Sequence, residues 1–217
     1  MDLLKVLQSR YTTKAYDANK TIPAEKFEQL LAMLRLAPSS INIQPWHFII
    51  ADHVAAKQRI AKALVGKYAY NAPKVLDSSH TILFCTKADI DAQHLEQLLA
   101  QDEISGRFKD EQAKQGQKDT RTGYIEFYRN EKGDIQSWAE NLTFIALGQM
   151  LLAAGIENID ATPIGGFNEE ILDQELQLTA QGLVPSVILT LGYRSEQDFN
   201  AKLPKSRLAE DLIFTRL

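Results

Sequence analysis

The chain has 217 residues, 45% of them hydrophobic and 24% charged, which is ordinary globular composition with enough length for one sizeable core. The formal net charge is −4, so no overall basic field would draw the protein to nucleic acid or to an anionic membrane. We therefore expect a single domain over residues 1–217, with local basic residues wherever an anion is bound.

The chain has one cysteine, Cys85, in an apolar run typical of a strand. A lone cysteine excludes an internal disulfide and indicates a reducing compartment, and its apolar setting favours an inert core thiol over a catalytic one. The first residues, 1–5, lack the long apolar stretch of a signal peptide, and we find no segment close to the ~20 apolar residues that span a bilayer. We expect a cytoplasmic protein.

The first half of the chain predicts helices and two strands. A short helix is expected over 2–10, and a second carries apolar residues at helical spacing from Phe27 to Leu34, between Pro23 and Pro38. Two strands are expected over 47–51 and 81–86. The remaining helices of this half are expected over 54–65, ended by Gly66, and over 91–101.

The second half begins with a polar segment, 105–120, that predicts a mobile surface excursion. Residues 134–154 give the strongest helix pattern, apolar on more than one face, which indicates a central core helix or a subunit interface. Gly155 is placed to end it. Residues 184–193 predict a long strand, with Pro185 suited to an edge or to a strand's beginning. The apolar, β-prone tail 212–217 needs a partner surface, on this chain or another.

Helices outnumber strands and do not alternate regularly with them, which predicts an α+β fold with a modest mixed sheet. No dinucleotide-binding GxGxxG follows a strand, and neither a Walker loop nor a GxSxG elbow is present. The four histidines, His47, His53, His80 and His94, show no metal-ligand spacing, so we predict no metal site.

Three basic clusters remain. They are residues 10–14 (Arg10, Tyr11, Thr12, Thr13 and Lys14), residues 71–74 with Asn71 and Lys74, and residues 205–207 with Lys205 and Arg207. Basic side chains interleaved with hydroxyl donors suit a phosphate, because charge-assisted hydrogen bonds are strong. The alternative for each cluster taken alone is a solvated surface patch.

Two loops and three tyrosines add to these clusters. The segment between Pro38 and Trp46 offers Ser39, Ser40, Asn42 and Gln44, which suit the polar edge of a heterocycle or a simple helix-to-strand turn. The segment Pro163-Ile-Gly-Gly-Phe167 would let a backbone approach a flat ligand or form an ordinary tight turn. Tyr68, Tyr70 and Tyr124 would line a pocket for flat substrates or pack.

These pieces occur in the order and spacing of the bacterial FMN-dependent nitroreductases of the oxygen-insensitive NAD(P)H nitroreductase and dihydropteridine reductase type, which the chain resembles nearly end to end. The segments that carry the resemblance are Pro38-Ser-Ser with Asn42, Gln44-Pro-Trp-His-Phe48, Pro163-Ile, Gly166-Phe167 and residues 198–208. The resemblance implies a nitroreductase-like α+β fold with a small mixed central sheet flanked by helices. It also implies an intertwined homodimer with one FMN per subunit at the interface.

The resemblance also implies residue roles. Arg10, Tyr11, Thr12, Thr13 and Lys14 would bind the flavin, with Lys205 and Arg207 on its phosphate and Lys14, Asn71 and Lys74 at its pyrimidine edge. Ser39, Ser40, Asn42 and Gln44 would reach it from the partner subunit, and Pro163, Ile164, Gly165 and Gly166 would lie along the ring. Ser40, Tyr68, Tyr70 and Tyr124 would contact the substrate.

The implied activity is a ping-pong reduction of nitroaromatics and quinones, with NADH or NADPH passing a hydride through flavin N5. No side chain need act as a general acid: the backbone of Gly165 would lie near N5, and Lys14 would stabilise the reduced flavin. The chain departs from the relatives at Tyr11 and Thr12, often histidine and serine there, at Gly165, commonly glutamate, and at Tyr70 and Tyr124, commonly phenylalanine. The alternatives are a flavin or dihydropteridine reductase and a non-catalytic flavin-binding sensor.

Overall fold

The computed structural model describes residues 2–217 and is built around a four-stranded sheet. Its strands are β1 (Trp46–Ala51), β2 (His80–Lys87), β3 (Asp160–Ile164) and β4 (Leu183–Gly192), in the spatial order β1-β2-β4-β3. The predicted α+β class is confirmed. The sheet was expected to be mixed, but its three strand pairings are all antiparallel, and the parallel contact is an isolated bridge from Thr12 to Ala161 on β3.

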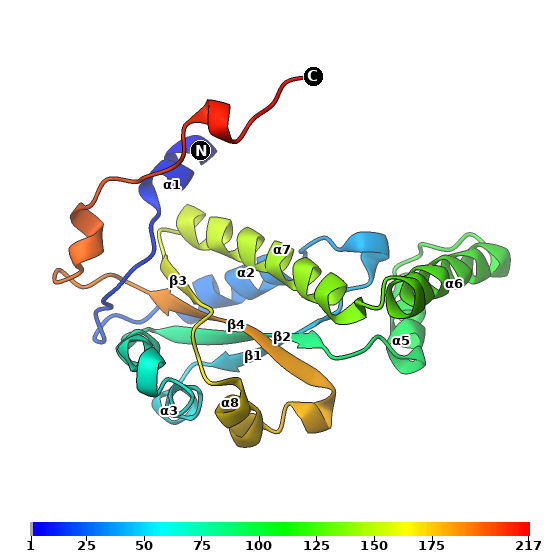
Figure 1. The fold of residues 1–217 in the computed structure, drawn as a ribbon, viewed down its shortest axis with the longest axis horizontal. Helices are drawn as coiled ribbons and strands as arrows, with labels where there is room; N and C mark the ends of the chain where they lie inside the picture. The colour runs from blue at the N-terminus through cyan, green and yellow to red at the C-terminus, as the bar shows by residue number, and fades with distance from the viewer. Residues whose placement is uncertain (1) are drawn as a thin grey trace.

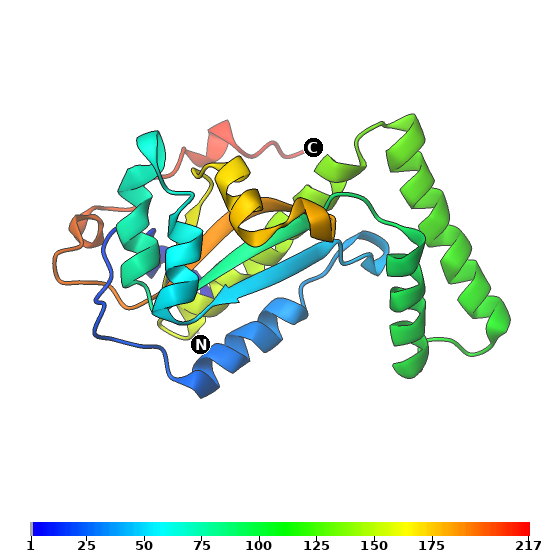
Figure 2. The same ribbon diagram turned by 90° about the horizontal axis from the view of Figure 1, so that it is seen from below.

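Helices cover both faces of the sheet (Figures 1 and 2). Successive side chains of a strand point to opposite faces, and on β2 Ile82 and Phe84 enter one core cluster while Leu83 and Cys85 enter the other. Because both faces are covered, β2 is buried along nearly its whole length, and its middle residues, 82–85, are all apolar. The helices of these layers are α2 (Ala24–Arg35) and α7 (Ile135–Ile156) on one face, and α3 (Val54–Ala61), α4 (Ala72–Asp77) and α8 (Glu169–Leu176) on the other.

The central helix α7 confirms the strongest helix prediction. Asp134 caps it by accepting from the backbone N–H of Ser137 at 3.3 Å, and it packs against α2 and β2. Gly155 was expected to end this helix but lies inside its last turn, where an added Cβ would come within 2.9 Å of Val6 on α1 (Leu3–Ser9). The glycine therefore serves the close packing of α1 on α7.

The sequence predicted no segment close to the ~20 apolar residues that span a bilayer, but one helix approaches that limit. Helix α7 is 22 residues long and contains an 18-residue window with a mean hydropathy of 1.3, enough by length and composition alone to cross a membrane. Its apolar composition has another explanation here, because nine of its residues are buried in the core. A central core helix is apolar on several faces for that reason.

The polar segment 105–120, predicted as a mobile surface excursion, instead contributes to helix α6 (Glu111–Glu126). Helix α6 runs beside α5 (Ala92–Ile104), and the pair projects from the body of the protein (Figure 2). Lys114 Nζ lies 2.7 Å from Glu103 and Lys118 Nζ 2.6 Å from Glu96, so ion pairs between the helices replace the apolar stripe that would have revealed α6 in the sequence. A π-helical turn, η3 (Phe127–Glu131), follows.

Three further details differ from expectation. Strand β3 had no predicted counterpart, and α3 ends at Ala61 rather than at 65. Strand β4 is internal, but Pro185 lies near its start, at an irregularity in the pairing with β2 and before the stretch that pairs with β3, so no ladder is broken. The tail forms a short turn, η6 (Glu210–Leu212), and no strand within residues 2–217.

Candidate functional site

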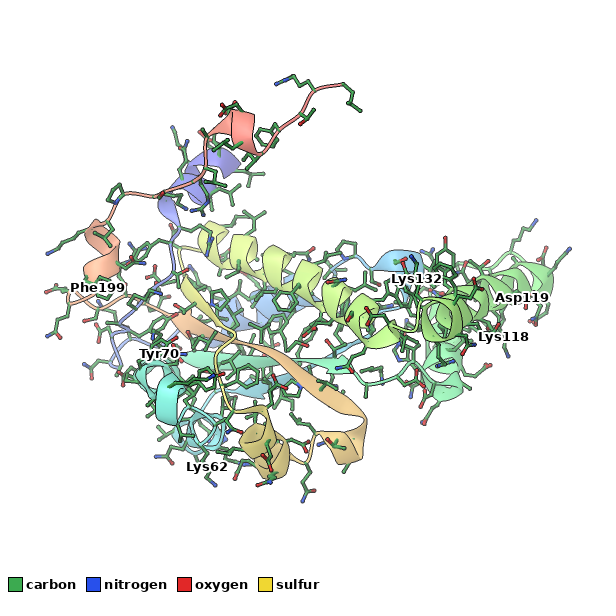
Figure 3. The ribbon with its side chains drawn as sticks, in the orientation of Figure 1. Lys62, Tyr70, Lys118, Asp119, Lys132 and Phe199 are labelled. Atoms are coloured by element: carbon green, nitrogen blue, oxygen red, sulfur yellow. The ribbon has the colours of Figure 1, made fainter. Side chains whose placement is uncertain are left out.

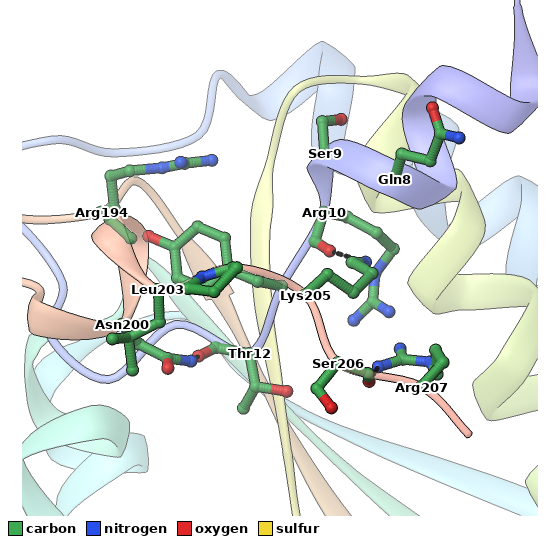
Figure 4. Close-up of a pocket in the computed structure, with 13 residues that line it drawn as sticks. Gln8, Ser9, Arg10, Thr12, Arg194, Asn200, Leu203, Lys205, Ser206 and Arg207 are labelled. Carbon is green, nitrogen blue, oxygen red and sulfur yellow. Dashed lines mark hydrogen bonds between the residues drawn. The ribbon is translucent and has the colours of Figure 1, made fainter. Parts of the chain in front are cut away.

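The two ends of the chain meet in one cavity of about 300 Å³ (Figure 4). The residues that leave α1 form one side, and the segment that follows the short turn η5 (Phe199–Lys202) forms the other. This brings together Arg10, Lys205 and Arg207, as the sequence predicts for two basic clusters almost 200 residues apart. The cavity is lined mostly by polar groups, among them Thr12 and Asn200.

Lys205 joins the two ends directly. Its Nζ donates to the backbone carbonyl of Leu7 at 2.5 Å and also to that of Arg10, at the C-terminal end of α1. Cations are favourable at this end of a helix because its last carbonyls lack partners. Burial, followed by the charges of Arg10 and Arg207, lowers the pKa of Lys205, and burial followed by the charge of Arg207 lowers the pKa of Arg10.

The three cations lie around one cavity and repel one another. In residues 2–217 neither Arg10, Lys205 nor Arg207 forms a salt bridge with an acidic side chain. A group of like charges around a cavity favours the binding of an anion, because the anion offsets the repulsion among them. The cavity is thus a candidate anion site on electrostatic grounds.

Hydrogen bonds to Asp198 fix the positions of Tyr11 and Asn200, two residues that line the cavity. The buried carboxylate of Asp198 accepts from Tyr11 Oη at 2.9 Å, from the Lys14 amide at 3.2 Å and from the Asn200 amide at 3.0 Å. Asn200 Nδ2 in turn donates to the Thr12 carbonyl at 2.7 Å. Burial, and then the hydrogen bond to Asp198, raise the pKa of Tyr11 to about 12, so its hydroxyl stays a neutral donor.

Sequence reasoning assigned no role to Asp198 or Asn200, although both lie in the segment that carries the family resemblance. The available signal was the Asp-x-Asn spacing of a side-chain-capped turn. Arg194, also unassigned, pairs with Asp160 at 2.6 Å and lies 4.7 Å over the Tyr11 ring. Tyr11 is therefore engaged with the scaffold on both its hydroxyl and its ring.

The strand-like segment from Thr12 runs alongside β3 toward a second cationic area. Tyr16 is buried and donates to Thr162 Oγ1 at 3.1 Å, while Thr162 Oγ1 donates to the carbonyl of Thr13 at 2.5 Å, which ties this segment to β3. The side chain of Thr13 is 0% exposed, so it packs and cannot reach a ligand. Lys14, which follows it, is half-buried, and its charge acts on Lys74.

The second area contains Lys74, Asn71 and Gly166. Lys74 Nζ donates to Asn71 Oδ1 at 2.9 Å and to the Tyr70 carbonyl at 2.8 Å, and Asn71 Nδ2 donates to the Gly166 carbonyl at 3.1 Å. Burial, followed by the charge of Lys14, lowers the pKa of Lys74. Asn71 and Lys74 are both buried, so their orientation is fixed by these bonds.

The two glycines of the loop differ. An added Cβ on Gly166 would come within 2.9 Å of Tyr68 Cδ1, so glycine is required there by close approach. Gly165 has open space around an added Cβ and lies outside the left-handed region, so no feature of the described chain demands glycine at this position. Pro163 and Ile164 end β3 just before them, and Pro163 is half-buried.

The remaining predicted residues lie elsewhere in the chain. Ser39, Ser40, Asn42 and Gln44 surround the turn η1 (Ser40–Asn42), which is held by α5 and α6. Tyr70 lies at the end of the molecule near α3, whereas Lys118 and Asp119 of α6, the helix that carries Tyr124, lie at the opposite end (Figure 3). A single chain therefore does not bring these groups together.

The sequence and the fold match known proteins along nearly the whole chain. The model of the nitroreductase family matches residues 7–193. Curated relatives include an oxygen-insensitive NAD(P)H nitroreductase of Enterobacter cloacae, 40% identical over 99% of both chains, and one of Salmonella typhimurium, 37% identical over 100% of both. A solved structure from Exiguobacterium sibiricum, described as a nitroreductase in complex with FMN, covers 100% of this chain and 98% of its own at 23% identity, with a TM-score of 0.83.

This chain belongs to the nitroreductase family. The resemblance noted in the sequence is thereby confirmed, and so is the nitroreductase-like fold. A further relative, the major NAD(P)H-flavin oxidoreductase of Aliivibrio fischeri, is 34% identical over 95% of each chain.

Proposed function

We propose that this protein is an FMN-dependent NAD(P)H oxidoreductase that reduces nitroaromatics and quinones, with residues 1–217 forming one FMN-binding domain of a homodimer. The observation that carries the proposal is the cavity where Arg10, Lys205 and Arg207 meet without an acidic partner among the described residues. The names of the relatives and the FMN complex of the structural neighbour support the same activity.

The residues present fit FMN. One cavity surrounded by three cations suits one terminal phosphate, because charged, fork-shaped donors bind phosphate oxygens well. Thr12 adds a hydroxyl to the same cavity. The chain lacks a dinucleotide-binding loop, so FMN is favoured over FAD.

The second cationic area suits the ring end of the same group. Asn71 and Lys74 are preset by their mutual hydrogen bond to present polar atoms to a heterocycle's edge, and Lys14 adds positive charge beside them. We assign Lys14 to stabilising negative charge on a reduced ring, and the backbone N–H of Gly165 to orienting it. When bound, the flavin supplies the two-electron chemistry between NADH or NADPH and the acceptor.

A second copy of the chain completes this site in the proposal. Ser39, Ser40, Asn42 and Gln44 come from the partner, because η1 lies far from the cationic cavity of its own chain (Figure 1). Tyr68 and Tyr70 of one chain and Tyr124 with Ser40 of the other would then contact the aromatic acceptor. Exposed Leu212, Ile213 and Phe214 of the tail give the second chain an apolar surface to cover.

We further propose a cytoplasmic protein that acts on small molecules, with no role for nucleic acid or a membrane. The net charge of −4 supports this, since it disfavours polyanionic partners. A flavin reductase is the second candidate, favoured by the 34% identity to the flavin oxidoreductase of Aliivibrio fischeri. Dihydropteridine reduction and a non-catalytic flavin sensor remain as outcomes of the test.

The test begins with the purified protein, which we expect to be yellow and to release FMN on denaturation, identified by chromatography. NADH and NADPH oxidation is then measured with a nitroaromatic, a quinone, free riboflavin and a quinonoid dihydropterin as acceptors. A colourless protein or released FAD would overturn the proposal. Bound FMN without NAD(P)H oxidation would identify a sensor, and the acceptor with the highest kcat/KM decides among the reductases.

A further inference from the structure

The turn that follows α2 has an unusual backbone. Three residues without glycine's freedom, Ile41, Asn42 and Gln44, have φ values of 47°, 54° and 45°. A β-branched residue such as Ile41 rarely adopts this left-handed conformation, because its side chain crowds the backbone. Such a turn persists only where its surroundings determine it strongly.

Two buried side chains from different helices provide those surroundings. His94 of α5 donates through Nε2 to the carbonyl of Ile43 at 2.7 Å, and Arg121 of α6 donates through Nε to the carbonyl of Ile41 at 3.1 Å. The side chain of Ile43, 0% exposed, packs in the same core cluster as Ile125 of α6. The turn is therefore fixed by hydrogen bonds to the carbonyls of Ile41 and Ile43 and by the packing of the Ile43 side chain in the core.

Arg121 also fixes the helix that carries it. Its side chain is 1% exposed, and Nη2 lies 2.7 Å from the carboxylate of Asp102 on α5. Among the described residues of α6, Arg121 and Ile125 are the buried ones, so these two side chains attach the helix to the body. Tyr124, three residues after Arg121, is exposed on the same helix.

We propose that Arg121 is a positioning residue that sets two walls of the acceptor site together, the turn 39–44 and the helix α6 that carries Tyr124. The inference rests on the proposed function, in which both segments contact the flavin or the acceptor. A buried ion pair seldom contributes more stability than apolar packing would, and Nη1 of Arg121 has no hydrogen-bond partner within the described chain. Its fork geometry, which reaches α5 and the turn at once, explains why arginine stands there.

The test replaces Arg121 by lysine in the full-length, FMN-loaded protein. One ammonium group cannot reach both Asp102 and the Ile41 carbonyl, so we expect faster deuterium exchange in 39–44 and in 119–126 together. The matched control is Arg129→Lys, because Arg129 follows α6, pairs with Asp89 at 2.7 Å and donates to the Ile90 carbonyl, but does not touch the turn. We expect its exchange at 39–44 to be unchanged.

Kinetics provide the second measurement. We expect Arg121→Lys to raise KM for a nitroaromatic about ten-fold, the effect of one lost charged hydrogen bond, with a smaller change in kcat. The same variant should bind FMN less tightly if the turn contacts the flavin. Arg129→Lys should leave both constants as in the parent protein.

Faster exchange confined to α6, or equal effects in the two variants, would overturn the proposal. If Arg121→Lys does not fold, Asp102→Asn decides by the same two-segment criterion, because it frees the guanidinium from α5. The exchange experiment needs no turnover, so it stands apart from the proposed function. A parent protein that binds FMN but oxidises no NAD(P)H would refute the function while leaving the coupling of the two segments measurable.

Discussion

Two regions of this protein are rich in basic side chains, and they differ in what those side chains contact. In the projecting helices α5 and α6 and the turn after them, Lys114, Lys118, Arg121 and Arg129 each lie within 2.7 Å of a carboxylate oxygen. In the cavity where the chain ends meet, the three cations have no such partner among residues 2–217. Burial, followed by the charges of neighbouring cations, lowers the pKa of Arg10 and of Lys205.

This difference in pairing distinguishes cations that stabilise the fold from cations that are available to bind a ligand. Paired cations hold helices in place and have little capacity left for a ligand, whereas unpaired, partly desolvated cations are held together against their own repulsion. Only a bound anion makes that arrangement favourable. Both regions are rich in lysine and arginine, so the number of basic residues does not distinguish them. The absence of carboxylate partners is what indicates the ligand site.

The largest effect should come from removing residues 209–217, directly beyond the unpaired region. Leu212, Ile213 and Phe214 are 69%, 53% and 64% exposed, which is costly unless a second chain covers them. We expect the truncated protein to sediment as a monomer and to lose most of its FMN, measured by the ratio of flavin to protein absorbance. A truncated dimer with full flavin content would show that the tail has no part in the site.

The next largest effect should come from substituting the unpaired cations themselves. We expect Arg207→Ala and Lys205→Ala each to weaken FMN binding by about 1.5–3 kcal/mol, the contribution of a charged hydrogen bond. Fluorescence titration of the apoprotein with FMN measures this. Lys118→Ala, which removes a paired cation, is the control and should bind FMN unchanged; equal losses in all three variants would abolish the distinction between the regions.

The loop 165–166 tests the ring end of the site. Gly165→Ala and Gly165→Glu should retain most flavin reduction by NADH, because both keep the backbone N–H and an added Cβ at this position meets no atom within 4 Å. Gly165→Pro removes the N–H, and we expect roughly ten-fold slower bleaching of the FMN band in stopped flow, as for one lost hydrogen bond.

Gly166→Ala serves as the contrasting variant. Its Cβ would displace Tyr68, so a clear loss of flavin affinity is expected there but not for Gly165→Ala. If Gly165→Pro reduces as fast as Gly165→Ala with flavin fully bound, the amide has no part in the reaction.

The smallest effect concerns pH. Burial lowers the pKa of His94 and of His80 below the ordinary 6.5. The charged groups near His94 are Lys87, Asp91 and Arg121, and those near His80 are Asp52 and Lys57. The unfolded chain therefore takes up protons first as pH falls below about 6.5, so the free energy of unfolding should decrease in that range.

Urea denaturation between pH 5 and 8 measures the dependence. His94→Gln and His80→Gln should each flatten it. Parallel pH profiles for the parent protein and both variants would show that neither buried histidine titrates on unfolding.

How much the sequence could predict depends on what stabilises each element. Helix α7 and strand β2 were predicted correctly because burial on several faces imposes an apolar pattern that is visible locally. Helix α6 was missed because ion pairs with α5 stabilise it, and those pairs leave no apolar period. Strand β3 was missed because Pro163 and the following glycines suggest a turn, while its partners on β4 lie 24 to 32 residues further along the chain.

The candidate site, like the fold, could be predicted only in part. Arg10, Lys205, Arg207, Asn71 and Lys74 could be selected as candidates because charged and amide side chains are visible in a sequence. The structure brings the first three together at one cavity and joins the other two by a hydrogen bond. Asp198 was not assigned, because its role comes from three hydrogen bonds that only folding brings together. Nor could the sequence reveal that Thr13 is wholly enclosed while its neighbours Thr12 and Lys14 face outward.

The separation of the turn 39–44 from the cationic cavity has a consequence for genetics. In a twofold dimer each complete site would draw one half from either chain, so a chain defective at Arg207 and a chain defective at Arg121 would fail on their own in different halves. Mixed at equal amounts, such chains would form dimers that contain one wholly unaltered site, and about a quarter of all sites would be restored. Two damaging alleles of this gene would then complement each other when expressed in one cell.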